Sequence, residues 1–167
     1  STVPCPIRYR IDSPITVDLP PGFKQTGATF NRFGMMNMRK AGGTLAVYMD
    51  DLAVDDQKWD FSSDPQWDGV GNRTTFTETE GRGAQDFGYT RTNFAGGQNG
   101  EIGGIIWRSP FASYADRIGP LTLKQPLVAP GKVVFTGADP DSDACLGWFR
   151  RGAQAGEKRA ARDFIGV

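Results

Sequence analysis

The chain has 167 residues, of which 19 are Lys or Arg and 19 are Asp or Glu, so its formal charge is zero, and it contains no histidine. Without imidazole, Ser-His-Asp and Cys-His nucleophilic systems, two-His metal sites and a histidine pH switch are excluded. The neutral charge and the lack of a basic stripe argue against nucleic acid as the main partner. The length fits a single domain with a substantial core.

Targeting signals and cysteines can indicate the cellular compartment in which a protein resides. No apolar run reaches the ~18 residues of a membrane span, and no charged start precedes an apolar segment, so we expect neither a span nor a retained signal peptide. Cys5 and Cys145 are too far apart in the sequence to form a CxxC metal site. They either form one disulfide, which would indicate an exported protein, or stay unpaired as buried thiols.

The first third of the chain is rich in proline and then in short apolar runs. Residues 1–30 contain five prolines around an alternating piece at 7–11, which predicts an edge strand and loop. Two apolar runs follow at 33–38 and 44–49, and a basic, glycine-containing segment separates them. This arrangement predicts a β-hairpin.

The middle of the chain changes composition twice. Residues 50–68 contain seven Asp against one Lys. Residues 72–80 alternate in a way that predicts a strand with one solvated face. Residues 81–100 are dominated by Gly, Asn, Gln and Thr, which predicts a long ordered loop, and loops of this length in a compact domain are usually functional or disordered.

Short strands dominate the last third. Strands are predicted at 101–107, 131–136 and 145–149, with a further short one at 121–123. Residues 150–167 form a basic tail that we expect to be solvated, with a short helix or loop and then an apolar strand that should pair within the chain or with a partner. About seven to nine short strands with almost no helix predict an all-β sandwich in one domain over 1–167.

Several segments stand in a fixed order between residues 33 and 167: Val47-Tyr48-Met49-Asp50-Asp51-Leu52, residues 61–73, Asp86-Phe87-Gly88-Tyr89-Thr90, Ala95-Gly96-Gly97, Gly100-Glu101-Ile102-Gly103-Gly104 and Gly147-Trp148-Phe149. Together they resemble segments of large exported bacterial proteins that are similar to concanavalin A-like and laminin G-like jelly rolls. The resemblance implies a jelly-roll-like β-sandwich and export, but no catalytic residues. Similar chains continue past residues 163–167 into further strands, which implies that residues 1–167 are part of a longer protein and do not complete the sandwich.

The Asp-rich segment is the main candidate for a metal site. Ca²⁺ takes six to eight oxygen ligands, which closely spaced carboxylates and loop carbonyls can supply. The spacing does not match an EF-hand, and turn formation by Asp explains the same residues. The candidate calcium ligands are Asp50, Asp51, Asp55, Asp56, Asp64 and Asp68.

Aromatic residues beside polar loop residues suggest sugar recognition, because apolar sugar faces stack on rings while amides and carboxylates bind hydroxyl groups. Trp107 and Trp148 lie within predicted strands and are expected in the core. The alternative is that all four tryptophans are structural. The candidate ligand-binding residues are Trp59, Trp67, Tyr89, Asn93, Phe94 and Gln98.

A glycoside hydrolase would need two carboxyl groups about 5 to 9.5 Å apart across a cleft. The only plausible acids are Glu78, Glu80, Asp86 and Glu101. Glu78 and Glu80 have the alternate spacing of acids on one strand face, yet a solvated edge explains them equally well. We therefore favour a protein that is not an enzyme.

The sequence thus predicts an extracellular or cell-surface binding module, with a polysaccharide or glycan as partner and calcium as an aid to binding. The first alternative is a structural subunit of a surface assembly, which would pair with another protein chain through its C-terminal strand. The second alternative is a carbohydrate-active hydrolase.

Overall fold

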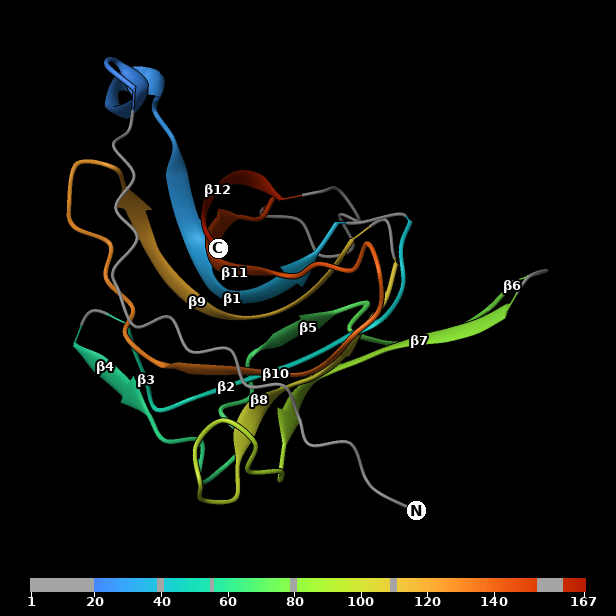
Figure 1. The fold of residues 1–167 in the computed structure, drawn as a ribbon. Helices are drawn as coiled ribbons and strands as arrows, with labels where there is room; N and C mark the ends of the chain where they lie inside the picture. The colour runs from blue at the N-terminus through green and yellow to red at the C-terminus, as the bar shows by residue number, and fades with distance from the viewer. Residues whose placement is uncertain (1–19, 39–40, 55, 79–80, 109–110, 153–160) are drawn as a thin grey trace.

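The computed structural model describes residues 20–167, except 39–40, 55, 79–80, 109–110 and 153–160 (Figure 1). This part of the chain is all-β, as predicted, and its paired strands are antiparallel. Its only helical element is the 3₁₀ turn η1 (Phe23–Thr26). None of the described residues belongs to a helix with the length and apolar character needed to cross a membrane.

The strands form two five-stranded sheets and one two-stranded ribbon. Sheet A has the order β12-β11-β1-β9-β5, sheet B has the order β10-β2-β8-β7-β6, and β3 pairs with β4. The bounds are β1 Thr29–Asn37, β2 Leu45–Asp50, β3 Leu52–Val54, β4 Gln57–Trp59, β5 Asp68–Val70, β6 Arg73–Glu78, β7 Gly81–Thr90, β8 Glu101–Ile106, β9 Ala112–Thr122, β10 Lys132–Ala138, β11 Cys145–Arg150 and β12 Arg162–Gly166.

Both sheets contribute to one hydrophobic core. Alternate residues of a strand point to opposite faces, so Phe33 and Met35 of β1 enter the core from sheet A, while Val47 and Met49 of β2 enter it from sheet B. Trp148 lies in the same core, as the sequence predicted. A shared core between two antiparallel sheets is consistent with a β-sandwich.

The predicted hairpin of residues 33–38 and 44–49 is wrong. Both segments are strands, but β1 pairs with β9 and β11 in sheet A, whereas β2 pairs with β8 and β10 in sheet B. The chain therefore crosses from one sheet to the other between β1 and β2. The reason is that strands from later in the chain pair with both edges of β1 and both edges of β2, so these two strands meet across the shared core and not edge to edge.

Half of the predicted loop at 81–100 is a β-strand. Residues Gly81–Thr90 form β7, which pairs with β6 on one side and β8 on the other, so only residues 91–100 form a loop. The long strand β9 was also missed, apart from its end near 121–123. Cross-strand partners hold both segments in the sheet despite their glycines and charged residues, which weaken the strand pattern in the sequence.

Sheet A bends strongly along β1 and β9 (Figure 1). Gly34 in β1 lies opposite Gly147 in β11, and Gly147 lies opposite Gly166 in β12. A Cβ atom at Gly34 would lie 2.4 Å from the carbonyl oxygen of Tyr114. This row of residues without side chains lets neighbouring strands approach closely where the sheet curves.

The C-terminal strand finds its partner within the chain. β12 pairs antiparallel with β11, and Val167 exchanges two backbone hydrogen bonds with Leu146 at 2.7 and 2.9 Å. β12 is the outer strand of its sheet. The predicted strand at 7–11, Cys5 and residues 153–160 of the predicted helix or loop at 153–162 lie outside the described residues. Cys145 is a free thiol, half-buried beside Met36 and Phe149, and burial raises its pKa.

Candidate functional site

The loop of residues 91–100 folds over the outer face of sheet B. Because Val47 and Met49 point into the core, their neighbours Tyr48 and Asp50 point to the opposite face of β2. The ring of Phe94 packs on the ring of Tyr48 with centroids 4.6 Å apart. The glycine-rich loop is thus anchored on the sheet by an aromatic pair.

Glu101 fixes the same loop through its carboxylate. It is the first residue of β8 and is fully buried. Its Oε1 accepts the backbone N–H of Phe94 at 2.9 Å, and its Oε2 accepts that of Ala95 at 2.7 Å. Such charge-assisted bonds are the strong ones in proteins, so one buried carboxylate sets the position of two consecutive loop residues.

Asp50 lies at the end of β2 and is only 2 % exposed. Its Oδ1 accepts the N–H of Asp51 at 2.7 Å. Gly96 closes over it so tightly that a Cβ atom there would lie 1.6 Å from Oδ2 of Asp50, so this contact requires glycine. Burial, followed by the nearby charges of Asp51 and Glu101, raises the pKa of Asp50, while the bond from Asp51 and the charge of Lys132 oppose the shift.

A pocket of about 610 Å³ opens between this loop, the end of β2 and the start of β10. Lys132 forms an ion pair with Asp51 at its rim. Asp60 accepts the N–H and the hydroxyl of Ser62 at 3.0 and 2.9 Å, and these bonds lower the pKa of Asp60. The pocket therefore presents carboxyl groups, amides, a hydroxyl and one ammonium group. Its lining residues are Asp50, Asp51, Asp60, Ser62, Gly96, Gly97, Gln98, Asn99 and Lys132.

The predicted ligand-binding residues are dispersed. Only Gln98 lines the pocket, and Asn93 is exposed elsewhere in the same loop. Trp67 is 7 % exposed and belongs to the core, where Trp59 meets it edge to face at 5.5 Å. Tyr89 is half-buried against that core. With Phe94 packed on Tyr48, the described residues that line the pocket include no aromatic ring.

The predicted calcium ligands are also separated. Asp50 and Asp51 reach the pocket, whereas Asp56 is exposed and Asp55 lies outside the described residues. Asp64 accepts the N–H of Gln66 at 2.8 Å, which is turn chemistry.

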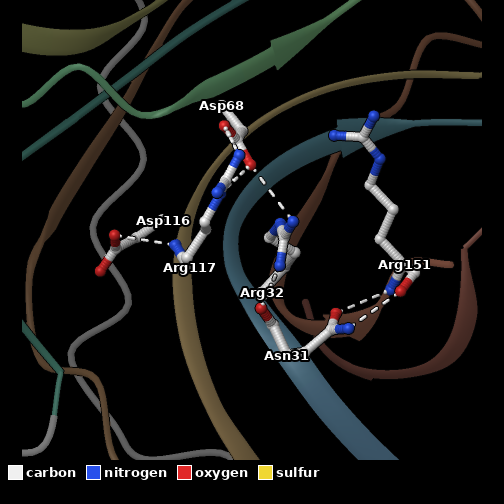
Figure 2. Close-up of polar contacts among 6 residues, drawn as sticks. All are labelled: Asn31, Arg32, Asp68, Asp116, Arg117 and Arg151. Carbon is white, nitrogen blue, oxygen red and sulfur yellow. Dashed lines mark hydrogen bonds and ion pairs between the residues drawn. The ribbon is translucent and has the colours of Figure 1, made fainter. Parts of the chain in front are cut away.

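Asp68 lies in sheet A and is bound by two arginines, Arg32 and Arg117 (Figure 2). Among the described residues, no group of three or more His, Cys, Asp or Glu is arranged to hold a metal ion.

Two of the four acids considered for hydrolysis have other partners. Glu101 anchors the loop, and Asp86 pairs with Arg73 at 2.6 Å on an exposed surface. Glu78 ends β6, and Glu80 is not among the described residues.

The sequence missed most of the pocket. Asn99 stands beside Gln98 in the polar loop, so composition could have found it, but Lys132 is more than 30 residues away in a strand with no distinguishing signal. Asp60 and Ser62 looked like ordinary turn residues. Tertiary packing, and not any local pattern, brings these three segments together.

Comparison of the chain with family models, with curated proteins and with solved structures finds no match. The fold and the pocket therefore define the protein by class alone: an all-β chain whose two antiparallel sheets share a core, with a polar pocket at one end of sheet B.

Proposed function

We propose that this chain is an extracellular binding module that takes a polyhydroxylated ligand of the carbohydrate class in the pocket beside residues 91–100. The observation that carries the proposal is the lining: Asp60, Gln98 and Asn99 offer acceptors and donors around one polar cavity. Sugar hydroxyl groups both donate and accept, so they suit such a mixed set.

The finer fold assignment and the location belong to the same proposal. We infer a jelly-roll-like sandwich from an exported protein. In its support, the chain changes sheet repeatedly. Apart from the β3–β4 ribbon, β1 lies in sheet A, β2 in sheet B, β5 in sheet A, β6 to β8 in sheet B, β9 in sheet A, β10 in sheet B, and β11 and β12 in sheet A. Such crossings between two antiparallel sheets are typical of double Greek-key sandwiches.

The experiment compares two asparagines of one loop. The protein is applied to a glycan array, and the best neutral glycan is then titrated by calorimetry against the parent, Asn99→Ala and Asn93→Ala. Asn99 lines the pocket, whereas Asn93 is exposed outside it. Loss of a hydrogen-bonding amide in the pocket should weaken binding about tenfold in Asn99→Ala, while Asn93→Ala should bind like the parent.

Several results would contradict the proposal. An array without hits, or equal affinity of the parent and Asn99→Ala, would remove the pocket as a sugar site. Repeating the titration with chelator and with added Ca²⁺ tests the role of calcium, which remains a prediction. Polymers in light scattering, together with an empty array, would favour the alternative of a structural subunit that pairs through the outer strand β12.

A further inference from the structure

The face of sheet A that points away from the shared core carries a group of arginines around one carboxylate. Arg32 of β1 lies directly opposite Arg117 of β9 in the strand register. Like charges in such positions repel. Asp68 of β5 relieves the repulsion by accepting two bonds from Arg117, at 2.6 and 2.9 Å, and one from Arg32 at 3.2 Å (Figure 2).

Arg151 is the third cation of this group, and its backbone is held in place. The side-chain amide of Asn31 donates to the carbonyl of Arg151 at 2.9 Å and accepts its N–H at 2.9 Å. This clamp fixes the residue after β11 against β1, beside Arg32. Figure 2 shows the guanidinium extending away from the clamp, and it makes no hydrogen bond or ion pair with any residue of the described part of the chain.

The group therefore holds more positive than negative charge in a partly buried place. The Arg32 side chain is 15 % exposed, and its Nε is buried without a hydrogen-bond partner in the structure. Burial lowers the pKa of Arg32. The positive charges of Arg151 and Arg117 lower it further, whereas Asp68 opposes the shift. Asp116 is a second acid nearby and accepts the backbone N–H of Arg117 at 2.8 Å, so the group has three arginines against two acids. A bound anion would compensate the remaining charge.

We propose that Arg32 and Arg151 bind a single oxyanion group of a ligand, a carboxylate or a sulfate, on this face of sheet A. Guanidinium groups match the geometry of such oxyanions and bind them with charge-assisted hydrogen bonds. Arg117 makes two of the three hydrogen bonds that Asp68 accepts, so Asp68 compensates the charge of Arg32 only in part, and Arg151 makes no hydrogen bond with Asp68. A nucleic acid backbone would need a longer series of cations than this neutral chain offers.

The site is independent of the pocket beside residues 91–100, because the two lie on different sheets. An acidic saccharide could supply either oxyanion, as a uronate carboxylate or as a sulfate ester, and that arm of the test rests on the proposed function. Free inorganic sulfate tests the site without that assumption.

The test is an NMR titration of the full chain with sodium sulfate, with chloride replaced at constant ionic strength and arginine Nε–H signals observed. Sulfate should shift the Arg32 and Arg151 signals with saturation. Arg151→Gln should weaken binding about tenfold or more. Arg150→Gln is the matched control, because it removes the same charge one residue away. The Arg150 side chain is half exposed, and its guanidinium lies 3.8 Å from the carboxylate of Asp163.

A second variant guards against a loss of fold. Asp68→Asn removes the competing carboxylate and should tighten sulfate binding severalfold, a gain that damage to the fold would not produce. Shifts without saturation, or equal weakening by Arg150→Gln and Arg151→Gln, would overturn the proposal.

Further titrations with acetate and with short oligogalacturonate separate the sources of the oxyanion. Binding of sulfate and acetate without the oligosaccharide would leave the oxyanion site in place and remove the saccharide arm. Asn99→Ala should bind sulfate like the parent, so a failure of the pocket proposal is distinguishable from a failure here.

Discussion

Asp50 is the pocket residue whose side chain has the most unusual environment. Its carboxyl group is almost fully buried under Gly96 and lies near the buried carboxylate of Glu101. Within the described part of the chain, it accepts one hydrogen bond, from the N–H of Asp51. Burial raises its pKa, so the folded protein holds this proton more tightly than the unfolded chain does.

The sign of the pH dependence follows from that shift. At a pH below the unfolded pKa, Asp50 is neutral in both states and imposes no penalty. As the pH rises towards the raised folded pKa, the unfolded chain ionises first, and stability falls. Asp50→Asn keeps the shape without the charge, so we expect it to match the parent in acid and to exceed its stability at neutral pH.

Urea unfolding of both proteins from acid to neutral pH measures this difference. Asp56→Asn is the matched control, because Asp56 is exposed. If Asp50→Asn were instead less stable than the parent at neutral pH, the ionised carboxylate would be stabilised in the fold, and a cation at the pocket would become the leading explanation.

At the level of elements, the loop of residues 91–100 is held to sheet B by side chains of the sheet. Glu101 accepts the N–H groups of Phe94 and Ala95, and within the loop the N–H of Gly100 donates to the carbonyl of Thr92 at 2.9 Å. The pocket wall at Gly96, Gly97, Gln98 and Asn99 belongs to the segment that these bonds enclose.

We therefore expect Glu101→Gln to loosen the pocket wall formed by residues 96–99. The neutral side chain has one acceptor oxygen, so one of the two loop amides loses its partner, and we expect a loss of about 1–3 kcal/mol in the free energy of unfolding. Amide hydrogen exchange at Phe94 and Ala95 should be faster, with β2 unaffected.

Asp86→Asn serves as its control. That carboxylate is 61 % exposed, and the loss of its surface pair should cost at most about 1 kcal/mol. Unchanged exchange at Phe94 and Ala95 in Glu101→Gln would show that the loop is held by other contacts.

The elements also show what local sequence can predict. Residues 44–49 form an apolar run, and they were correctly predicted to be a strand, which the structure shows as β2. The partner strands of β2 were not predicted, because strand pairing depends on segments far along the chain. Of the candidate site, the sequence found the acidic end of β2 and Gln98, but Lys132 and the arginines of sheet A are brought together by the register of distant strands.

Considered as a whole, the molecule depends on the core that both sheets share. Phe87 of β7 is fully buried in it. Phe87→Ala should cost about 3–5 kcal/mol, because it removes a large side chain and leaves a cavity. Since one core joins the two sheets, tryptophan fluorescence and far-UV circular dichroism should report a single coincident urea transition.

Phe164→Ala is the matched comparison for this substitution. Phe164 is 37 % exposed on the outer strand β12, so the same change should cost only about 1 kcal/mol. Two separate transitions, or equal losses in the two variants, would contradict a single cooperative core.

The central place of β1 in sheet A has a consequence for how the chain folds. Phe33 lies opposite Asp116 on one side and opposite Trp148 on the other, so both neighbours of this strand come from much later in the sequence. Closing such long loops costs entropy before any contact repays it, and chains of this kind fold slowly, on the order of milliseconds to seconds. During synthesis β1 has no strand partner until β9 has emerged and only one until β11 has emerged, so the newly made chain passes through a period in which it is prone to aggregate.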